Sequence, residues 1–301
     1  MIKKLWLNTL GLTILIFTIS ATTNDNGKKV IHYISNSGEL STTIKIPDYK
    51  DSLKIMQITD VHISIADEKE SDLMKYGDRM HKAYMNPRKH YSMDFSKTTF
   101  KYLDDLLLKA KNDHIELLLL TGDIVNFPSA VSVKYVYDRL TKTGIPWLYT
   151  SGNHDWHYEG MSGSLDSLRK TWIDKSLLPF YNGSNPLFYS AIIKGINFVG
   201  IDNSTENVNN RQVEFLKDQL KRKEPIVLIS HIPYNLNNGT GQPEMISMID
   251  LITSNSDKIV AIFAGHIHKS SFYFTGNLCQ YTSLAAFQGG SLNIYIKPTS
   301  H

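Results

Sequence analysis

Apolar and polar positions along the chain fall into blocks whose periods separate strands from helices. Short continuous apolar runs are typical of buried strands, and apolar residues three and four apart are typical of helices packed on a sheet. The predicted strands cover residues 53–59, 116–120, 147–150, 188–193, 196–201, 226–229, 259–263, 272–274, 278–283 and 292–296. The predicted helices cover residues 95–111, 130–141, 165–172, 212–220 and 244–253. Strands and helices alternate through most of this order, which predicts a layered α/β fold.

The end of the chain departs from this alternation. Its last three predicted strands follow one another without a helix, so we expect them to be antiparallel neighbours. No repeat and no Pro/Gly-rich linker divides residues 53–301, and we therefore expect them to form one domain.

Residues 1–21 have the layout of a secretory signal peptide. Lys3 and Lys4 precede a largely apolar stretch that ends in Ser20-Ala21. An uncleaved membrane anchor is the alternative, but the stretch is shorter than the ~20 residues of a spanning helix, and polar residues interrupt it. The protein is thus predicted to be exported.

Residues 22–52 form a polar lead-in to the domain. Within it, residues 30–35 and 40–46 are expected to pair as a hairpin across Asn36-Ser37-Gly38.

A second polar stretch, residues 64–93, lacks an apolar rhythm and is predicted to be a long loop. Loops of this length in compact domains are usually functional or mobile. It is either a solvated insertion or a rim or lid over a site. In the second case its basic side chains could meet substrate charge: Arg79, His81, Arg88, Lys89 and His90.

Charge and cysteine content narrow the class of protein. The formal net charge of +3 falls to +1 when Lys3 and Lys4 are removed, so no nucleic-acid partner is expected. Cys279 is the only cysteine, which excludes an intramolecular disulfide. For an exported protein this favours the periplasm or another extracellular location of a bacterium. Three asparagines each begin a glycosylation sequon, and we expect them to lie in surface loops: Asn182, Asn203 and Asn238.

Five clusters of metal-binding side chains lie where predicted strands end. They are Asp60-Val61-His62, Gly122-Asp123, Gly152-Asn153-His154-Asp155, Ser230-His231 and Gly265-His266-Ile267-His268. Ligands of open α/β sheets collect at the carboxyl ends of strands, so we expect these clusters to converge. Residues two apart in an extended backbone point to one face, which would pair Asp60 with His62 and His266 with His268. Carboxylates, an amide and imidazoles suit Mn, Fe, Zn or Co.

The five clusters together resemble the signature of the calcineurin-like metallophosphoesterase superfamily, over residues 53–269. The resemblance implies a four-layer sandwich of two mixed β-sheets flanked by helices, with two divalent metal ions at one edge. It also implies the following roles: Asp60, His62 and His268 bind the first metal, Asn153, His231 and His266 bind the second, Asp123 bridges them, and His154 is a catalytic histidine outside the ligand set. Asp155 is expected either to orient the His154 imidazole or to cap the following turn.

At two places the chain departs from the motifs of particular subfamilies, and each departure argues against membership of that subfamily. Asn126 stands where purple acid phosphatases carry a tyrosine, so a ferric-tyrosinate site is not expected. Serine/threonine phosphatases have Asp-Arg-Gly at Asn126-Phe127-Pro128, which argues against a protein phosphatase.

The predicted function is metal-dependent phosphoester hydrolysis. A hydroxide bridging the two metals would attack phosphorus in line, and His154 would assist the leaving group. A cyclic-nucleotide or other phosphodiesterase is the alternative to a phosphomonoesterase, and a non-catalytic scaffold of the same fold is a further one. The expected partner is a phosphorylated small molecule, with no stable membrane anchor after signal cleavage.

Overall fold

The computed structural model describes residues 15–20, 30–36, 40–65, 68–69, 74–84, 98–157, 162–237 and 241–299. Its strands are β1 (Leu15–Ser20), β2 (Ile31–Asn36), β3 (Leu40–Ile46), β4 (Leu53–Ile58), β5 (Leu117–Thr121), β6 (Trp147–Thr150), β7 (Phe188–Ile193), β8 (Ile196–Ile201), β9 (Ile226–Ile229), β10 (Ile259–Ala264), β11 (Ser271–Thr275), β12 (Leu278–Thr282) and β13 (Leu292–Pro298). The α-helices are α1 (Met74–Tyr84), α2 (Thr99–Asn112), α3 (Ala130–Thr143), α4 (Leu165–Trp172), α5 (Asn210–Leu220) and α6 (Pro243–Ser254). Shorter helical turns are η2 (Ile173–Leu177), η3 (Leu178–Tyr181) and η4 (Ala286–Gln288).

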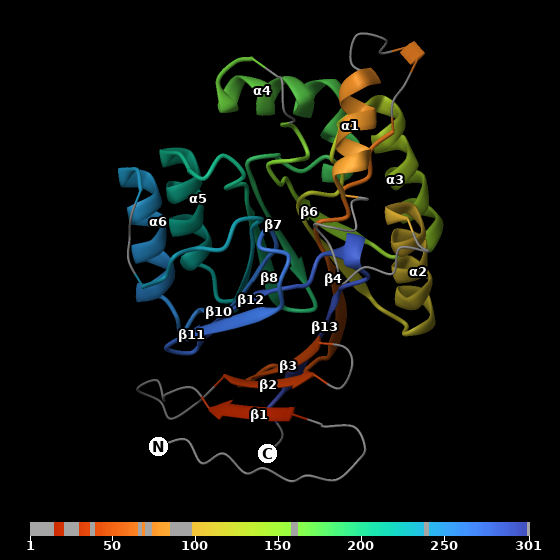
Figure 1. Ribbon diagram of the computed structural model, residues 1–301. Helices are drawn as coiled ribbons and strands as arrows, with labels where there is room; N and C mark the ends of the chain where they lie inside the picture. Colours follow the sequence, from red (N-terminus) through yellow and green to blue (C-terminus); the bar gives the residue numbers. More distant parts are fainter. Residues whose placement is uncertain are drawn as a thin grey trace.

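Two mixed sheets form the centre of the molecule. The first has the order β1-β2-β3-β13-β4-β5-β6, and the second has the order β11-β12-β10-β9-β8-β7. Helices α5 and α6 cover the outer face of the second sheet, while α2 and α3 cover the outer face of the first (Figure 1). The four-layer sandwich expected from the resemblance is therefore confirmed.

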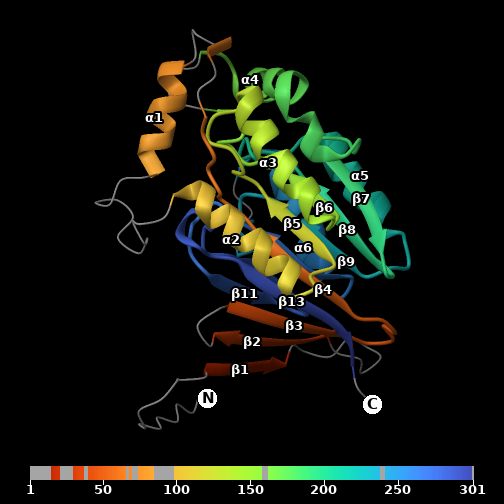
Figure 2. The same cartoon turned by 90° about the vertical axis from the view of Figure 1, so that its right-hand side faces the viewer.

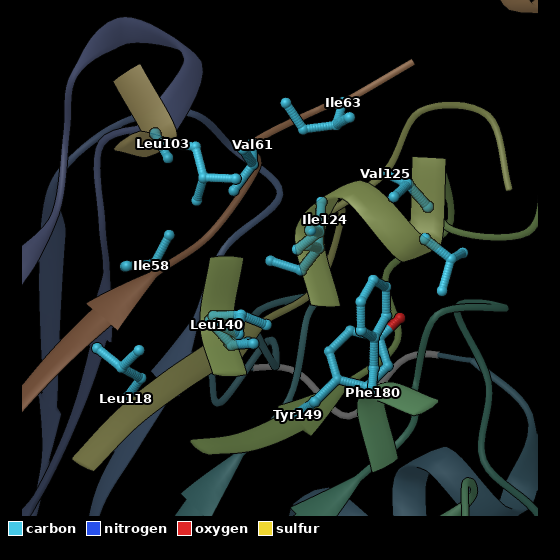
Figure 3. Close-up of a cluster of buried hydrophobic side chains, with 14 of the residues drawn as sticks. Ile58, Val61, Ile63, Leu103, Leu118, Ile124, Val125, Leu140, Tyr149 and Phe180 are labelled. Carbon is cyan, nitrogen blue, oxygen red and sulfur yellow. The ribbon is translucent and has the colours of Figure 1, made fainter. Parts of the chain in front are cut away.

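Strand β5 explains why the layers hold together. All five of its residues are buried, and its leucines alternate between two cores. Leu118 and Leu120 face the helices α2 and α3, whereas Leu117 and Leu119 face the other sheet. The period of two along a strand produces this division, and burial on both faces accounts for the continuous apolar run. Figure 3 shows the helix-facing core, in which Leu103 of α2 lies near Ile58 and Val61.

Helix boundaries follow local capping signals. The hydroxyl of Thr98 accepts a hydrogen bond from the Lys101 backbone, so α2 begins at Thr99 rather than at residue 95. Ser129 caps α3 in the same way, and Gly144 ends it with a left-handed φ of 72°.

Two expectations about elements were wrong. The stretch of residues 64–93 is not all loop, because residues 74–84 form α1, a helix of mostly polar residues that stands apart from the sheets (Figure 2). Strand β13 is not a neighbour of β12. It crosses to the first sheet, where it pairs antiparallel with β4 and parallel with β3.

The N-terminal hairpin is confirmed, since β2 and β3 pair antiparallel from Ile31 opposite Lys45 to Asn36 opposite Leu40. Strand β1 lies within the predicted signal peptide and adds to the outer edge of β2. No helix in the described part of the chain is long and apolar enough to cross a membrane. Cleavage after residue 21 stays a prediction.

Candidate metal centre

All five clusters lie just beyond strand ends and meet at one edge of the sandwich. Asp60 and His62 follow β4, Asp123 follows β5, Asn153 follows β6, His231 follows β9, and His266 and His268 follow β10. Two groups of side chains each bring one ligand atom within 4.8 Å of the others: Asp60, His62 and His268, and Asp123, His231 and His266. Side chains from both sheets are thus combined in each group.

The first group is centred on Oδ1 of Asp60. The Nε2 atom of His268 lies 3.2 Å from this oxygen and that of His62 lies 3.8 Å from it. The two imidazole nitrogens are 3.4 Å apart. Three ligand atoms facing one point in this way match the spacing needed around one cation.

The second group is centred on Oδ2 of Asp123. The Nε2 atom of His231 lies 3.2 Å from this oxygen, and Nε2 of His62, from the first group, lies 3.9 Å from it. Asp123 therefore stands between the two groups, the position expected of a bridging carboxylate. His266 completes the group, with its ring centroid 5.2 Å from that of His231.

Four buried ligand atoms have no hydrogen-bond partner in the described structure: Asp60 Oδ1, Asp123 Oδ2, Asn153 Oδ1 and His231 Nε2. Burying such atoms unpaired costs roughly 1–3 kcal/mol each, and more for a charged group. The cost is removed if cations bind them. The residues present therefore fit two metal ions.

The other polar atom of Asp60, Asp123 and His231 is already engaged. Asp60 Oδ2 accepts hydrogen bonds from the Thr59 hydroxyl (2.7 Å) and the His266 backbone (3.0 Å). Asp123 Oδ1 accepts one from the His154 backbone (2.8 Å), and His231 Nδ1 donates to the Thr121 carbonyl (2.8 Å). Such contacts hold each ligand with its free atom toward the site.

Asn126, noted in the sequence only as a departure, orients His62. Its amide nitrogen donates to the Met80 carbonyl (2.9 Å), which turns its oxygen toward His62 Nδ1 at 3.3 Å. The proton of His62 then lies on Nδ1, and Nε2 is left as a ligand atom.

The backbone around the ligands is strained rather than extended. Positive φ values occur at five ligands: Asp60 (53°), His62 (55°), Asp123 (54°), His266 (70°) and His268 (53°). Left-handed backbone costs roughly 1–2 kcal/mol for a residue with a Cβ. The expectation of extended backbone at these residues was therefore wrong, although Asp60 and His62 do belong to one group. His266 and His268 in fact belong to different groups.

Two glycines are required by close approach. A Cβ on Gly152 would lie 2.2 Å from Asp123 Oδ1, and one on Gly265 would lie 1.9 Å from the Thr59 hydroxyl oxygen. Neither distance is possible for real atoms, so the ligand loops pack this closely only because these positions are glycine.

Burial and neighbouring charges set the protonation of the ligands. Burial holds the pKa of His62 well below its usual value, which favours the neutral imidazole that binds metal. Burial alone would raise the pKa of Asp123, but the His231, His154 and His62 imidazoles outweigh it and hold that pKa below its usual range. Asp123 is thus a carboxylate.

Comparison with known proteins agrees with this geometry. The sequence profile of the calcineurin-like phosphoesterases matches residues 53–270, which is most of the chain. The chain belongs to the calcineurin-like phosphoesterase family. It is a hydrolase that acts on phosphoester bonds, with two candidate Asp/His metal sites.

Similar folds occur among solved structures. A dimetal phosphatase from Danio rerio is 12% identical, with a TM-score of 0.53 over 78% of this chain and 88% of that one. A purple acid phosphatase from Lupinus luteus seeds is 11% identical, with a TM-score of 0.48 over 87% of this chain and 50% of that one. A 5′-nucleotidase from Candida albicans is 14% identical, with a TM-score of 0.47 over 78% of this chain and 45% of that one. Among curated proteins, none matches the sequence.

Asp155 of this phosphoesterase does not contact the His154 ring. Its Oδ2 accepts hydrogen bonds from the Asp123 and Gly152 backbones (2.9 and 2.8 Å) and from the Tyr149 hydroxyl (2.8 Å). Its Oδ1 accepts one from the Val125 backbone (2.8 Å). His154 Nδ1 is buried without a partner in the described structure. The geometry agrees with the turn-capping alternative, and it ties two ligand loops together.

Other residues of the phosphoesterase site carried no sequence signal. Tyr84 of α1 stacks on the His62 ring at a centroid distance of 3.7 Å. Asn203 Oδ1 accepts hydrogen bonds from the His231 and Ile232 backbones (3.3 and 3.0 Å) and is 1% exposed. The interpretation of the Asn203 sequon as a surface loop was therefore wrong.

Several expected residues cannot be placed at the site. Asn182 is exposed, as expected for its sequon, and Arg79 is also exposed. The remaining positions lie outside the described residues or side chains: His81, Arg88, Lys89, His90 and Asn238.

Proposed function

We propose that this protein hydrolyses phosphoesters of small molecules with two divalent metal ions bound between its sheets. Asp60, His62 and His268 would hold one ion. Asn153, His231 and His266 would hold the other, with Asp123 shared. The observation that carries the proposal is that Asp60 Oδ1, Asp123 Oδ2 and His231 Nε2, which belong to the two ligand groups, are buried without a hydrogen-bond partner. Mn, Fe, Zn or Co suit this mixed set of oxygen and nitrogen donors.

The ions, when bound, polarise the phosphoryl group and activate a water molecule. The protein residues then have separate tasks. The ligands hold their free atoms toward the ions because their other atoms are hydrogen-bonded. Asn126 and Asp155 keep His62 and the Asp123 and Gly152 turns in place.

His154 is the residue that assists the leaving group. Its backbone N–H is held by Asp123 Oδ1 at 2.8 Å, so its ring stands beside the ligands without belonging to either group. As the bond between phosphorus and the leaving oxygen breaks, the electron pair stays on oxygen and the imidazole Nε2 supplies a proton to it.

The proposal predicts that His154→Ala loses turnover without losing metal. This variant should keep both metals, because His154 is not a ligand, and lose roughly 10²- to 10⁴-fold in kcat, the usual contribution of a general acid. Metal content by mass spectrometry and hydrolysis of an alkyl phosphate, whose basic leaving group needs the proton, provide the measurements. His231→Ala is the comparison, since it should lose metal and activity together. A His154→Ala protein that also loses metal would mean that His154 is a ligand.

The near-neutral charge of the chain supports a small phosphorylated substrate rather than a nucleic acid. A panel of monoesters, diesters and cyclic nucleotides, assayed with each metal, tests this part. Hydrolysis of polynucleotides in preference to every small ester would contradict it.

A further inference from the structure

Helix α1 places an aromatic residue directly over the metal centre. The Tyr84 ring lies parallel to that of His62, with an interplanar angle of 13° and a centroid distance of 3.7 Å. It also meets Phe287 edge to face at 5.0 Å and His268 at 6.2 Å. Tyr84 thus covers the ring of one ligand and contacts a second, although it lies outside both ligand groups.

The position of α1 is tied to the ligand loops themselves. The hydroxyl of Ser64, two residues after His62, donates to the Gly77 carbonyl at 2.7 Å. The amide of Asn126, three residues after Asp123, donates to the Met80 carbonyl at 2.9 Å. Both loops that carry ligands therefore hold the helix, and Tyr84 is fixed relative to the metal ligands.

The Tyr84 hydroxyl points toward His154. Its oxygen lies 3.5 Å from His154 Nε2, the atom that would donate the proton to the leaving group. Catalytic hydrogen bonds are often long before substrate binds, so this spacing leaves room for one oxygen that both groups can reach.

We propose that Tyr84 is a second substrate-contacting donor, whose hydroxyl hydrogen-bonds the leaving-group oxygen that His154 protonates. This inference rests on the function proposed above. Tyr84 keeps its proton throughout and stabilises the charge that develops on oxygen. Two donors on one oxygen matter most when the leaving group is a strong base. The substrate class is therefore phosphoesters of aliphatic alcohols rather than of acidic phenols.

The test compares Tyr84→Phe with Tyr76→Phe, the same change on the same helix at a residue that packs against the apolar core. With Tyr84→Phe, kcat for an alkyl phosphate should fall roughly 10- to 100-fold, while kcat for p-nitrophenyl phosphate should fall less than about threefold. Metal content should be unchanged. The affinity for vanadate, which offers an oxygen at the leaving-group position, should fall about tenfold. Tyr76→Phe should match the wild type.

Three outcomes would overturn the inference: equal losses on both esters, no loss on either, or loss of metal in Tyr84→Phe. If the wild type turned over neither ester, the proposed function would fail. The vanadate measurement would still decide the contact, because equal affinity in wild type and Tyr84→Phe would mean that the hydroxyl does not reach the anion.

Discussion

Each ligand in this site is prepared by its own surroundings. Thr59, Thr121 and the His154 backbone take up the polar atoms that face away from the site. Left-handed backbone at Asp60 and His62 then turns their side chains toward it. Strain of this kind persists only where surrounding contacts over-determine the conformation. Here those contacts include the four hydrogen bonds that Asp155 accepts, two of which come from the backbones of Asp123 and Val125 in the neighbouring ligand loop.

At the scale of the residue, Asp155→Asn distinguishes a role in holding the ligand loops together from a role in orienting His154. The amide group cannot accept on its nitrogen, so at least one backbone donor among those now bound would be left unpaired. We expect unfolding to become about 1–3 kcal/mol easier and metal content to fall. Thermal unfolding and metal analysis measure this. Asp138→Asn, at an exposed pair with Lys134, is the control and should change little. A variant that kept both metals but lost turnover would instead support an orienting role toward His154.

Among the elements, the N-terminal hairpin is joined to the domain by more than strand pairing. His32 of β2 is fully buried, and its Nδ1 lies 2.7 Å from the Tyr281 hydroxyl of β12 in the other sheet. Its Nε2 lies 3.1 Å from the Asn277 carbonyl, and Thr42 of β3 donates to the same Tyr281 hydroxyl. These polar contacts join strands β2 and β3 of the first sheet to strand β12 of the second sheet and to Asn277 beside it.

His32 should make the protein acid-sensitive. Burial lowers its pKa from 6.5 to about 4, so between these values the unfolded chain binds the proton and the folded protein does not. Its contribution to stability is therefore complete above pH 6.5 and is lost as pH falls toward 4, by on the order of 3 kcal/mol. Denaturant unfolding of His32→Gln across this range should show a shallower fall than the wild type. His114→Asn, at an exposed position, should retain the wild-type slope; equal slopes for His32→Gln and wild type would contradict the assignment.

Across the whole molecule, the site exists only because two sheets share one edge. The first sheet supplies Asp60, His62 and Asp123, and the second supplies His231, His266 and His268. Strand β1, in contrast, pairs only with β2 at the far edge of the first sheet, away from the strand ends that carry ligands.

Removal of residues 1–21 should therefore leave the site intact. Exported protein should begin near Thr22 when its N-terminus is sequenced, and the shortened chain should bind two metals with the activity of the full chain. Loss of one outer strand leaves the β4, β5 and β6 neighbours unchanged. Exported protein that retains residues 1–21, or a shortened chain without metal, would contradict this.

The sequence by itself determined most of the elements, α1 excepted, and the chemical identity of the ligands. Buried strands such as β6 and β9 and amphipathic helices such as α4 were predicted at their observed bounds, because their signals are local. The ligand clusters were readable for the same reason, since each is a short motif after an apolar run.

Only the tertiary structure decided how these parts combine. It assigned β13 to the first sheet, gave Asp155 its backbone partners and brought Tyr84 over His62. None of these follows from local pattern, because each depends on contacts between segments far apart in the chain. Most residues of helix α1 are polar, so it does not stand out as an apolar block in the sequence. The ligands with left-handed backbone are held by hydrogen bonds that only the assembled loops can make.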